Sequence, residues 1–129
     1  MKNKLIVIGF VLLMGCNNSK SINNIGDYQT LAKGIKEGDL NSYSKMKILC
    51  LDYKPTEIIK WAKFAADSIN YKPANLDVFE AYLDSYYIFE DTIDLKVFSD
   101  VDRKDVLIYY QKAKFNKVQG VEKYFLISK

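Results

Sequence analysis

The sequence predicts an all-α fold over residues 27–129, built from antiparallel helical hairpins with about five to six helices. Two observations support this prediction. Apolar residues recur at i, i+3, i+4 and i+7 through most of the region, which is the spacing of one helix face. Residues that cap or stop helices interrupt the pattern at short intervals, so consecutive helices are joined by short connections and are expected to pack antiparallel.

The first two predicted helices lie on either side of Gly38, which suits the left-handed conformation after a helix end. Asp27 is expected to cap the first helix, and Asp39 the second. The apolar face of the first helix comprises Tyr28, Leu31, Ala32 and Ile35. The second helix is expected to bury Leu40, Tyr43, Met46 and Cys50.

The third predicted helix, from about Pro55 to Ile69, has the strongest helical pattern in the chain. Pro55 suits a first helical turn, and Asn70 suits a left-handed stop. Its apolar residues are Ile58, Ile59, Trp61, Ala62, Phe64, Ala65, Ala66 and Ile69. Pro73 begins the fourth helix, which runs to Tyr87 or Phe89 and is expected to bury Leu76, Phe79, Leu83 and Tyr86.

The helical pattern blurs over residues 90–99. Ile93, Leu95 and Val97 alternate with polar residues, which suits a short strand, but no partner strand is evident, so we expect a loop or a short helical turn. Ser99 is expected to cap a fifth helix, Asp100–Phe115, with Val101, Val106, Tyr109, Tyr110 and Ala113 in the core. A sixth helix is predicted from about Lys117 to Ile127, burying Val118, Val121 and Phe125.

The N-terminus has the features of a bacterial secretory signal peptide: two lysines, an apolar run from Leu5 to Met14, and a small residue, Gly15. That run is about 15 Å long as a helix, which is too short to cross a hydrocarbon core of about 30 Å. The sequence Leu13-Met14-Gly15-Cys16 resembles the lipobox of bacterial lipoproteins, although Met14 stands where that family usually has Ala, Ser, Thr or Val.

The lipobox resemblance implies cleavage between Gly15 and Cys16 and acylation of Cys16, for example with palmitate. Residues 1–15 are then the signal peptide, and residues 16–26 are the lipidated cysteine and a polar tether. The protein is expected in the bacterial cell envelope, held to the membrane through these acyl chains. Asn17 favours the outer membrane, because an Asp after the cysteine is the inner-membrane retention signal in enterobacteria.

Composition narrows the possible chemistry. The chain has no histidine, which excludes Ser–His–Asp and Cys–His catalysis and imidazole metal sites, so we predict no enzyme activity, no cofactor and no metal. Cys50 is interpreted as a small buried residue. The net charge of +3 falls to +1 once Lys2 and Lys4 leave with the signal peptide, and this does not suit nucleic-acid binding.

Two stretches, Trp61–Asp67 and Tyr109–Phe115, share an aromatic residue followed by Ala four positions on. This pattern resembles the second helix of Sel1-like repeats, a branch of the tetratricopeptide (TPR) repeats, and Tyr109, Tyr110, Lys112 and Ala113 match best. The Glu-x-Gly of that family is absent from both copies. The resemblance implies a short α-solenoid that binds proteins on a concave surface, with no catalytic residues.

Candidate partner-binding residues form two groups. Asp77, Glu80 and Asp84 fall on one side of the fourth helix and make an acidic stripe, whereas three tyrosines are candidates for exposed contact points. These are Tyr53, Tyr71 and Tyr87. The leading hypothesis is a lipid-anchored protein–protein interaction module, including an immunity or inhibitor protein. The alternatives are a small carboxylate- and tyrosine-based enzyme or ligand carrier, or a passive structural lipoprotein.

The lipobox makes a direct prediction. Labelled palmitate supplied to growing cells should be incorporated into the wild-type protein and into Cys50→Ser, but not into Cys16→Ser, because only Cys16 stands in the lipobox. Gel autoradiography and mass spectrometry of the mature N-terminus measure the outcome. A mature protein that carries an unmodified thiol on Cys16 would contradict it.

Overall fold

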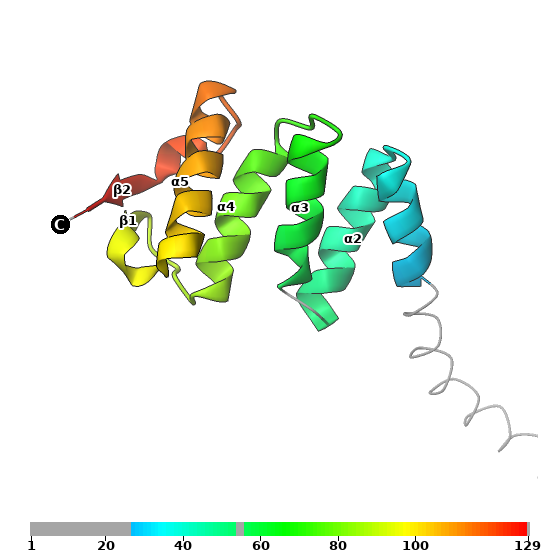
Figure 1. The fold of residues 1–129 in the computed structure, drawn as a ribbon, viewed down its shortest axis with the longest axis horizontal. Helices are drawn as coiled ribbons and strands as arrows, with labels where there is room; N and C mark the ends of the chain where they lie inside the picture. Colours follow the sequence, from blue (N-terminus) through cyan, green and yellow to red (C-terminus); the bar gives the residue numbers. More distant parts are fainter. Residues whose placement is uncertain (1–26, 54–55, 129) are drawn as a thin grey trace, which may run out of the picture.

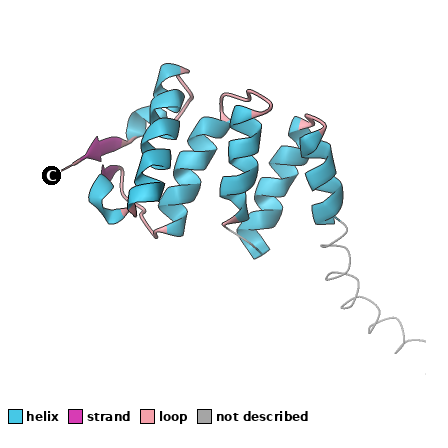
Figure 2. Ribbon diagram, in the orientation of Figure 1, coloured by secondary structure: helices cyan, strands magenta, loops and turns pink. Residues whose placement is uncertain are grey.

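The computed structural model describes residues 27–53 and 56–128 (Figure 1). This part contains five α-helices, which confirms the all-α prediction. They comprise residues 27–36, α2 (Leu40–Tyr53), α3 (Glu57–Asp67), α4 (Ala74–Ser85) and α5 (Asp100–Phe115). The helices follow one another in a row in chain order, joined by short loops (Figures 1 and 2).

The turn between the first helix and α2 forms as predicted. Gly38 has φ of +88°, and the Asp39 carboxylate accepts the backbone N–H groups of Asn41 and Ser42 at 3.0 and 3.3 Å. Tyr43, Met46 and Cys50 are buried along α2. The predicted burial of Leu40 is wrong: it is exposed, because it lies about 120° around the helix from Met46.

Helix α3 packs against both α2 and α4. Its small residues Ala62 and Ala65 are fully buried. Asn70 has φ of +58°, as expected for a left-handed stop, and Pro73 occupies the cap position of α4. Helix α4 is shorter than predicted because Tyr87, at φ of +56°, ends the helical path. The predicted start at Pro55 lies outside the described residues.

The predicted sixth helix is wrong. Strand β2 (Phe125–Ile127) pairs in parallel with β1 (Thr92–Asp94), and Ile93 lies opposite Leu126. A 3₁₀ turn, η2 (Val121–Lys123), precedes β2. Left-handed residues at Lys117 and Gly120, with φ of +51° and +96°, stop a helix from continuing through this segment. Phe125, which was predicted to be buried, is exposed as a consequence.

The alternation at residues 93–97 therefore does mark a strand, and our preference for a loop there was wrong in part. Strand β1 covers the first half of that stretch, and the 3₁₀ turn η1 (Leu95–Val97) follows it. The partner strand was not evident because it comes only after α5, which is the crossover that a parallel pair requires. Ile93 is fully buried beneath the pair.

Helix α5 has the predicted bounds, and the Ser99 hydroxyl accepts the N–H of Asp102 at 3.2 Å. Val106 and Ala113 are fully buried, and Tyr109 and Tyr110 nearly so. Val101, which was predicted to lie in the core, is exposed because it falls on the far side of the helix from Val106.

Hydrogen bonds from tyrosine hydroxyls to carboxylates join different elements throughout the domain. Three of them link helices that are two apart in the row: the first helix to α3, α2 to α4, and α3 to α5. The pairs are Tyr28–Glu57, Tyr43–Asp77, Tyr82–Asp105, Tyr86–Asp102, Tyr109–Asp67 and Tyr124–Glu80. Many of the chain's tyrosines are therefore structural cross-links.

The predicted signal peptide and tether lie outside the described residues. Within residues 27–53 and 56–128, no helix combines the length and apolar character needed to cross a lipid bilayer.

Close packing makes a prediction at Gly34, in the first helix. A Cβ added there would lie 2.8 Å from the Cβ of Ser42 on α2 and would clash with its hydroxyl. Gly34→Ala should therefore destabilise the protein by about 1–2 kcal/mol in urea denaturation, although Ala normally stabilises a helix interior. In a Ser42→Gly background the same change should stabilise it by about 0.5–1 kcal/mol. Equal effects in the two backgrounds would contradict the packing argument.

Candidate functional site

Two adjoining hollows, of about 450 and 320 Å³, form a groove along α4. Both are lined in part by Glu80 and Asp84, so these side chains mark the junction. The larger hollow lies between α2 and α4, and Ile58 of α3 contributes to it. We call the two hollows together the α4 groove.

The larger hollow is lined by matching faces of two helices. Each helix contributes residues at i, i+3, i+4 and i+7, which is one face of a helix. They are Ser44, Lys47, Ile48 and Leu51 on α2 and Asp77, Glu80, Ala81 and Asp84 on α4. Asp77, Glu80 and Asp84, which the sequence analysis grouped as an acidic stripe, line this hollow together.

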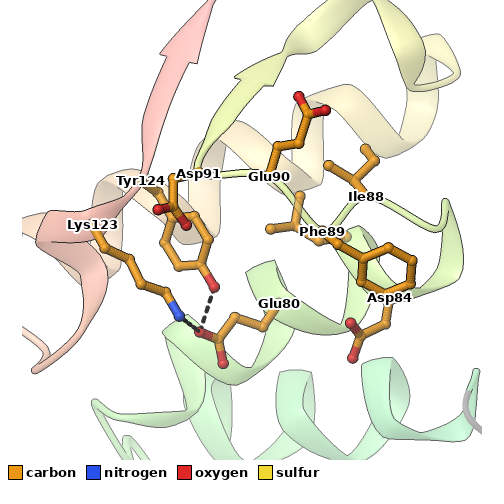
Figure 3. Close-up of a pocket in the computed structure, with 9 residues that line it drawn as sticks. Glu80, Asp84, Ile88, Phe89, Glu90, Asp91, Lys123 and Tyr124 are labelled. Atoms are coloured by element: carbon orange, nitrogen blue, oxygen red, sulfur yellow. Dashed lines mark hydrogen bonds and ion pairs between the residues drawn. The ribbon is translucent and has the colours of Figure 1, made fainter.

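The smaller hollow lies where α4 meets the segments around the two strands (Figure 3). Lys123 and Tyr124 converge on the same oxygen of Glu80: Nζ lies 3.7 Å and the donating hydroxyl 2.8 Å from Oε1. Residues 88–91 complete the hollow. Glu80 is therefore a structural anchor for the segment that leads into β2.

The acidic residues of the groove differ in their bonding. Asp77 is held by Tyr43 at 2.6 Å and by Lys47 at 3.0 Å. Asp84 and Glu90 are exposed and form no hydrogen bond or ion pair through their side chains with the part of the chain that the structure describes. Five carboxylates and two lysines line the groove, which gives it a net charge of −3.

Apolar side chains stand exposed beside these charges. Ile48 and Leu51 on α2 are 65% and 58% exposed, and Phe89 at the other end of the groove is 81% exposed. None of these three residues was among the partner-binding residues predicted from the sequence. The exposure of Ile48 and Leu51 could have been predicted, because both lie off the buried face of α2. Only the fold places them opposite an acidic helix face.

The three candidate tyrosines do not gather at one surface. Tyr71 is half-buried and packs edge-on against Tyr43, with ring centroids 6.0 Å apart. Tyr87 is 82% exposed, next in the chain to the segment that lines the smaller hollow. The Tyr53 side chain lies outside the described residues. Only Tyr87 among those described is thus placed to extend the groove.

A second polar cluster joins α3, α4 and α5. Lys63 and the Tyr82 hydroxyl both donate to Asp105. Burial lowers the pKa of Lys63, but hydrogen bonds with Asp105 and Tyr82 outweigh it and raise that pKa. Burial likewise raises the pKa of Asp105, but hydrogen bonds from Lys63 and Tyr82 outweigh it and lower that pKa. Both pKa values move away from 7, so Lys63 and Asp105 stay charged near neutral pH. Neither group is therefore suited to transfer a proton there.

Metal binding has no evident location in this part of the protein. Among the residues described, no group of three or more His, Cys, Asp or Glu side chains is arranged to hold an ion. Asp77 and Glu80, the best-placed carboxylates, are already engaged by lysine and tyrosine partners.

No known protein family, curated protein or solved structure matches this chain.

The tyrosine–carboxylate bonds predict how stability depends on alkaline pH. Burial, reinforced by the negative charge of Asp77, raises the pKa of Tyr43 far above its usual 10.0. Burial and the hydrogen bond to Asp67 also raise the pKa of Tyr109. The unfolded chain should therefore release these protons from about pH 10 upward while the folded chain keeps them, so stability is complete below pH 10 and falls above it.

Urea denaturation between pH 8 and pH 11.5 measures this loss. The double variant Tyr43→Phe/Tyr109→Phe should have a lower free energy of unfolding at pH 8 but a shallower decline above pH 10. Tyr87→Phe, at an exposed position, is the control. Identical alkaline slopes in the wild type and the double variant would show that these hydroxyls do not govern the transition.

Proposed function

We propose that this chain is a lipid-anchored protein of the bacterial cell envelope that binds another protein along the α4 groove. The observation that carries this proposal is the pairing of exposed apolar side chains with unpaired carboxylates along the two hollows of the α4 groove. Ile48, Leu51 and Phe89 supply apolar surface, and Asp84 and Glu90 supply charge without an internal partner.

The composition of the groove supports a protein segment as its ligand. Burial of apolar surface is the dominant favourable contribution to most protein–protein association, and charges around that surface select the partner and accelerate its approach. With a net charge of −3, the groove favours a segment that presents Lys or Arg beside apolar residues. The proposed partner is therefore a basic, amphipathic stretch of a protein.

The proposed anchor places this groove near a membrane. A random coil of ten residues, the length of the proposed tether after Cys16, would span roughly 17 Å on average and would keep the domain close to the lipid surface. Asn17 favours the outer membrane. Helices in a row, with side-chain bonds between helices two apart, support an arrangement of the Sel1/TPR-like α-solenoid kind.

An immunity or inhibitor role is the form of binding that we favour. A small domain tethered at the envelope is well placed to intercept a basic secreted protein, because the acidic groove attracts it before contact. The groove would then occlude a functional surface of that protein.

Binding of designed peptides tests the groove. The full-length chain, reconstituted in nanodiscs, is titrated into fluorescent amphipathic peptides that share apolar residues but carry either lysines or glutamates. The lysine peptide should bind more tightly, and its affinity should fall as salt is raised. Asp84→Asn/Glu90→Gln should weaken it about threefold to tenfold, because each exposed ion pair contributes up to about 1 kcal/mol.

The matched control is Glu37→Gln/Asp100→Asn, which removes the same charge from exposed positions outside the groove. This variant should bind the lysine peptide almost as the wild type does. Equal affinity for the two peptides, or equal weakening by both double variants, would rule out charge-selective binding in the groove.

A further inference from the structure

A third hollow, which we call the first-helix hollow, lies between the first helix and α2. Its volume is about 460 Å³, similar to that of the larger hollow of the α4 groove. Both helices line it: Asp27, Thr30 and Leu31 come from the first helix, and Lys45, Ile48 and Leu49 from α2. Ile48 also lines the larger hollow of the groove. The row of adjoining hollows therefore extends past α2 to the first helix.

The first-helix hollow differs in charge from the smaller hollow of the groove. Asp27 and Lys45 balance each other, and the other side chains that line the first-helix hollow are uncharged. The smaller hollow is lined by four carboxylates and one lysine. Two of those carboxylates, Asp84 and Glu90, form no side-chain hydrogen bond or ion pair with the residues that the structure describes. One end of the row of hollows is thus neutral, and the other end offers available negative charge.

The neutral end presents apolar surface. Leu31 and Leu49 are half-buried against the core, and Ile48, which is 65% exposed, lines the hollows on both sides of it. An apolar side chain that enters the first-helix hollow would remove this surface from water. Asp27 and Lys45 are exposed, so such a side chain would not bury an unpaired charge. The hollow therefore suits an apolar group of a ligand.

We propose that the first-helix hollow is a second subsite for the partner segment, which places an apolar side chain there and its basic residues beside Asp84 and Glu90. This inference rests on the proposed function, because it extends the surface that the same partner occupies. It specifies that partner further. The segment has two unlike ends, with an apolar residue at one end and Lys or Arg at the other.

The order of the hollows indicates how the partner segment lies. They follow the row of helices, so the segment crosses the helices instead of lying along one of them (Figure 1). Packed helices lie about 8–10 Å apart, so the path from the first-helix hollow to the far side of α4 is roughly 25–30 Å long. An extended chain covers that distance with about eight or nine residues. A helix about 10 Å wide would rest on Ile48, whereas an extended segment can direct side chains into the hollows on both sides of it.

Peptides that differ in the spacing of their two ends test this inference. The full-length chain in nanodiscs is titrated into fluorescent peptides that carry a leucine and a pair of lysines, separated by about seven or by about two Thr and Ser residues. The peptide with the longer spacer should bind about fivefold more tightly, because only it spans both subsites. Replacing its leucine by serine should remove this advantage.

Thr30→Trp is the matching change in the protein. Thr30 is exposed and lines the first-helix hollow, so a bulky side chain at this position would fill it. The variant should bind the long-spacer peptide about fivefold more weakly and its serine version as the wild type does, because both changes remove the same contact. Gln29→Trp is the matched control, since Gln29 is exposed on the same helix but does not line the hollow. It should leave both affinities unchanged.

The outcomes separate this inference from the proposed function. If Asp84→Asn/Glu90→Gln weakens both leucine peptides but Thr30→Trp weakens neither, the α4 groove binds its partner and the first-helix hollow is not a subsite. If neither variant weakens either peptide, the proposed function fails as well. Two further results would overturn the inference by assigning another occupant to the hollow. Tighter peptide binding by Ile22→Ser/Ile25→Ser would indicate the chain's own preceding residues, and a dimer in sedimentation equilibrium that Thr30→Trp dissociates would indicate a second copy.

Discussion

A tyrosine hydroxyl that donates to a carboxylate on another element is the interaction on which the arrangement of helices depends. Tyr43 is completely buried, and its hydroxyl reaches Asp77 on α4 at 2.6 Å. A buried hydroxyl without a partner costs roughly 1–3 kcal/mol, so a helix that shifted along its axis would lose such a bond and leave the group unsatisfied. Because these bonds also join helices two apart in the row, they fix helices beyond the nearest neighbour.

The same bonds determine which carboxylates of the acidic stripe on α4 can still bind a partner. Asp77 and Glu80 are engaged by tyrosine and lysine side chains, which stabilise the packing of α2 and of the C-terminal segment against α4. Asp84, one turn further on, has no such partner among the described residues. A single helix face therefore combines structural and available carboxylates, and the available one stands at the junction of the two hollows.

The C-terminal segment completes the domain in a different way. Strand β2 pairs with β1, and the buried Tyr110 hydroxyl donates to the carbonyl of Tyr124 at 2.8 Å. These contacts hold the last residues on the inner side of α5, against the same side of the helix as the core. The outer face of α5 consequently remains uncovered by the part of the chain described, and Val101, Ile108 and Phe115 are exposed on it.

The sequence by itself determined the helices whose signals are local. The spacing of apolar residues predicted the first four helices and α5, and Gly38, Asn70 and Ser99 predicted where helices end or are capped. Each of these signals depends on only a few neighbouring residues. Only the tertiary structure decided the features that depend on distant partners. Strand β1 needed β2 beyond an intervening helix, and the groove needed α2 opposite the acidic face of α4. Val101 is compatible with the helix whether it lies in the core or at the surface of the domain. Its exposure was therefore decided by which face of α5 packs against α4.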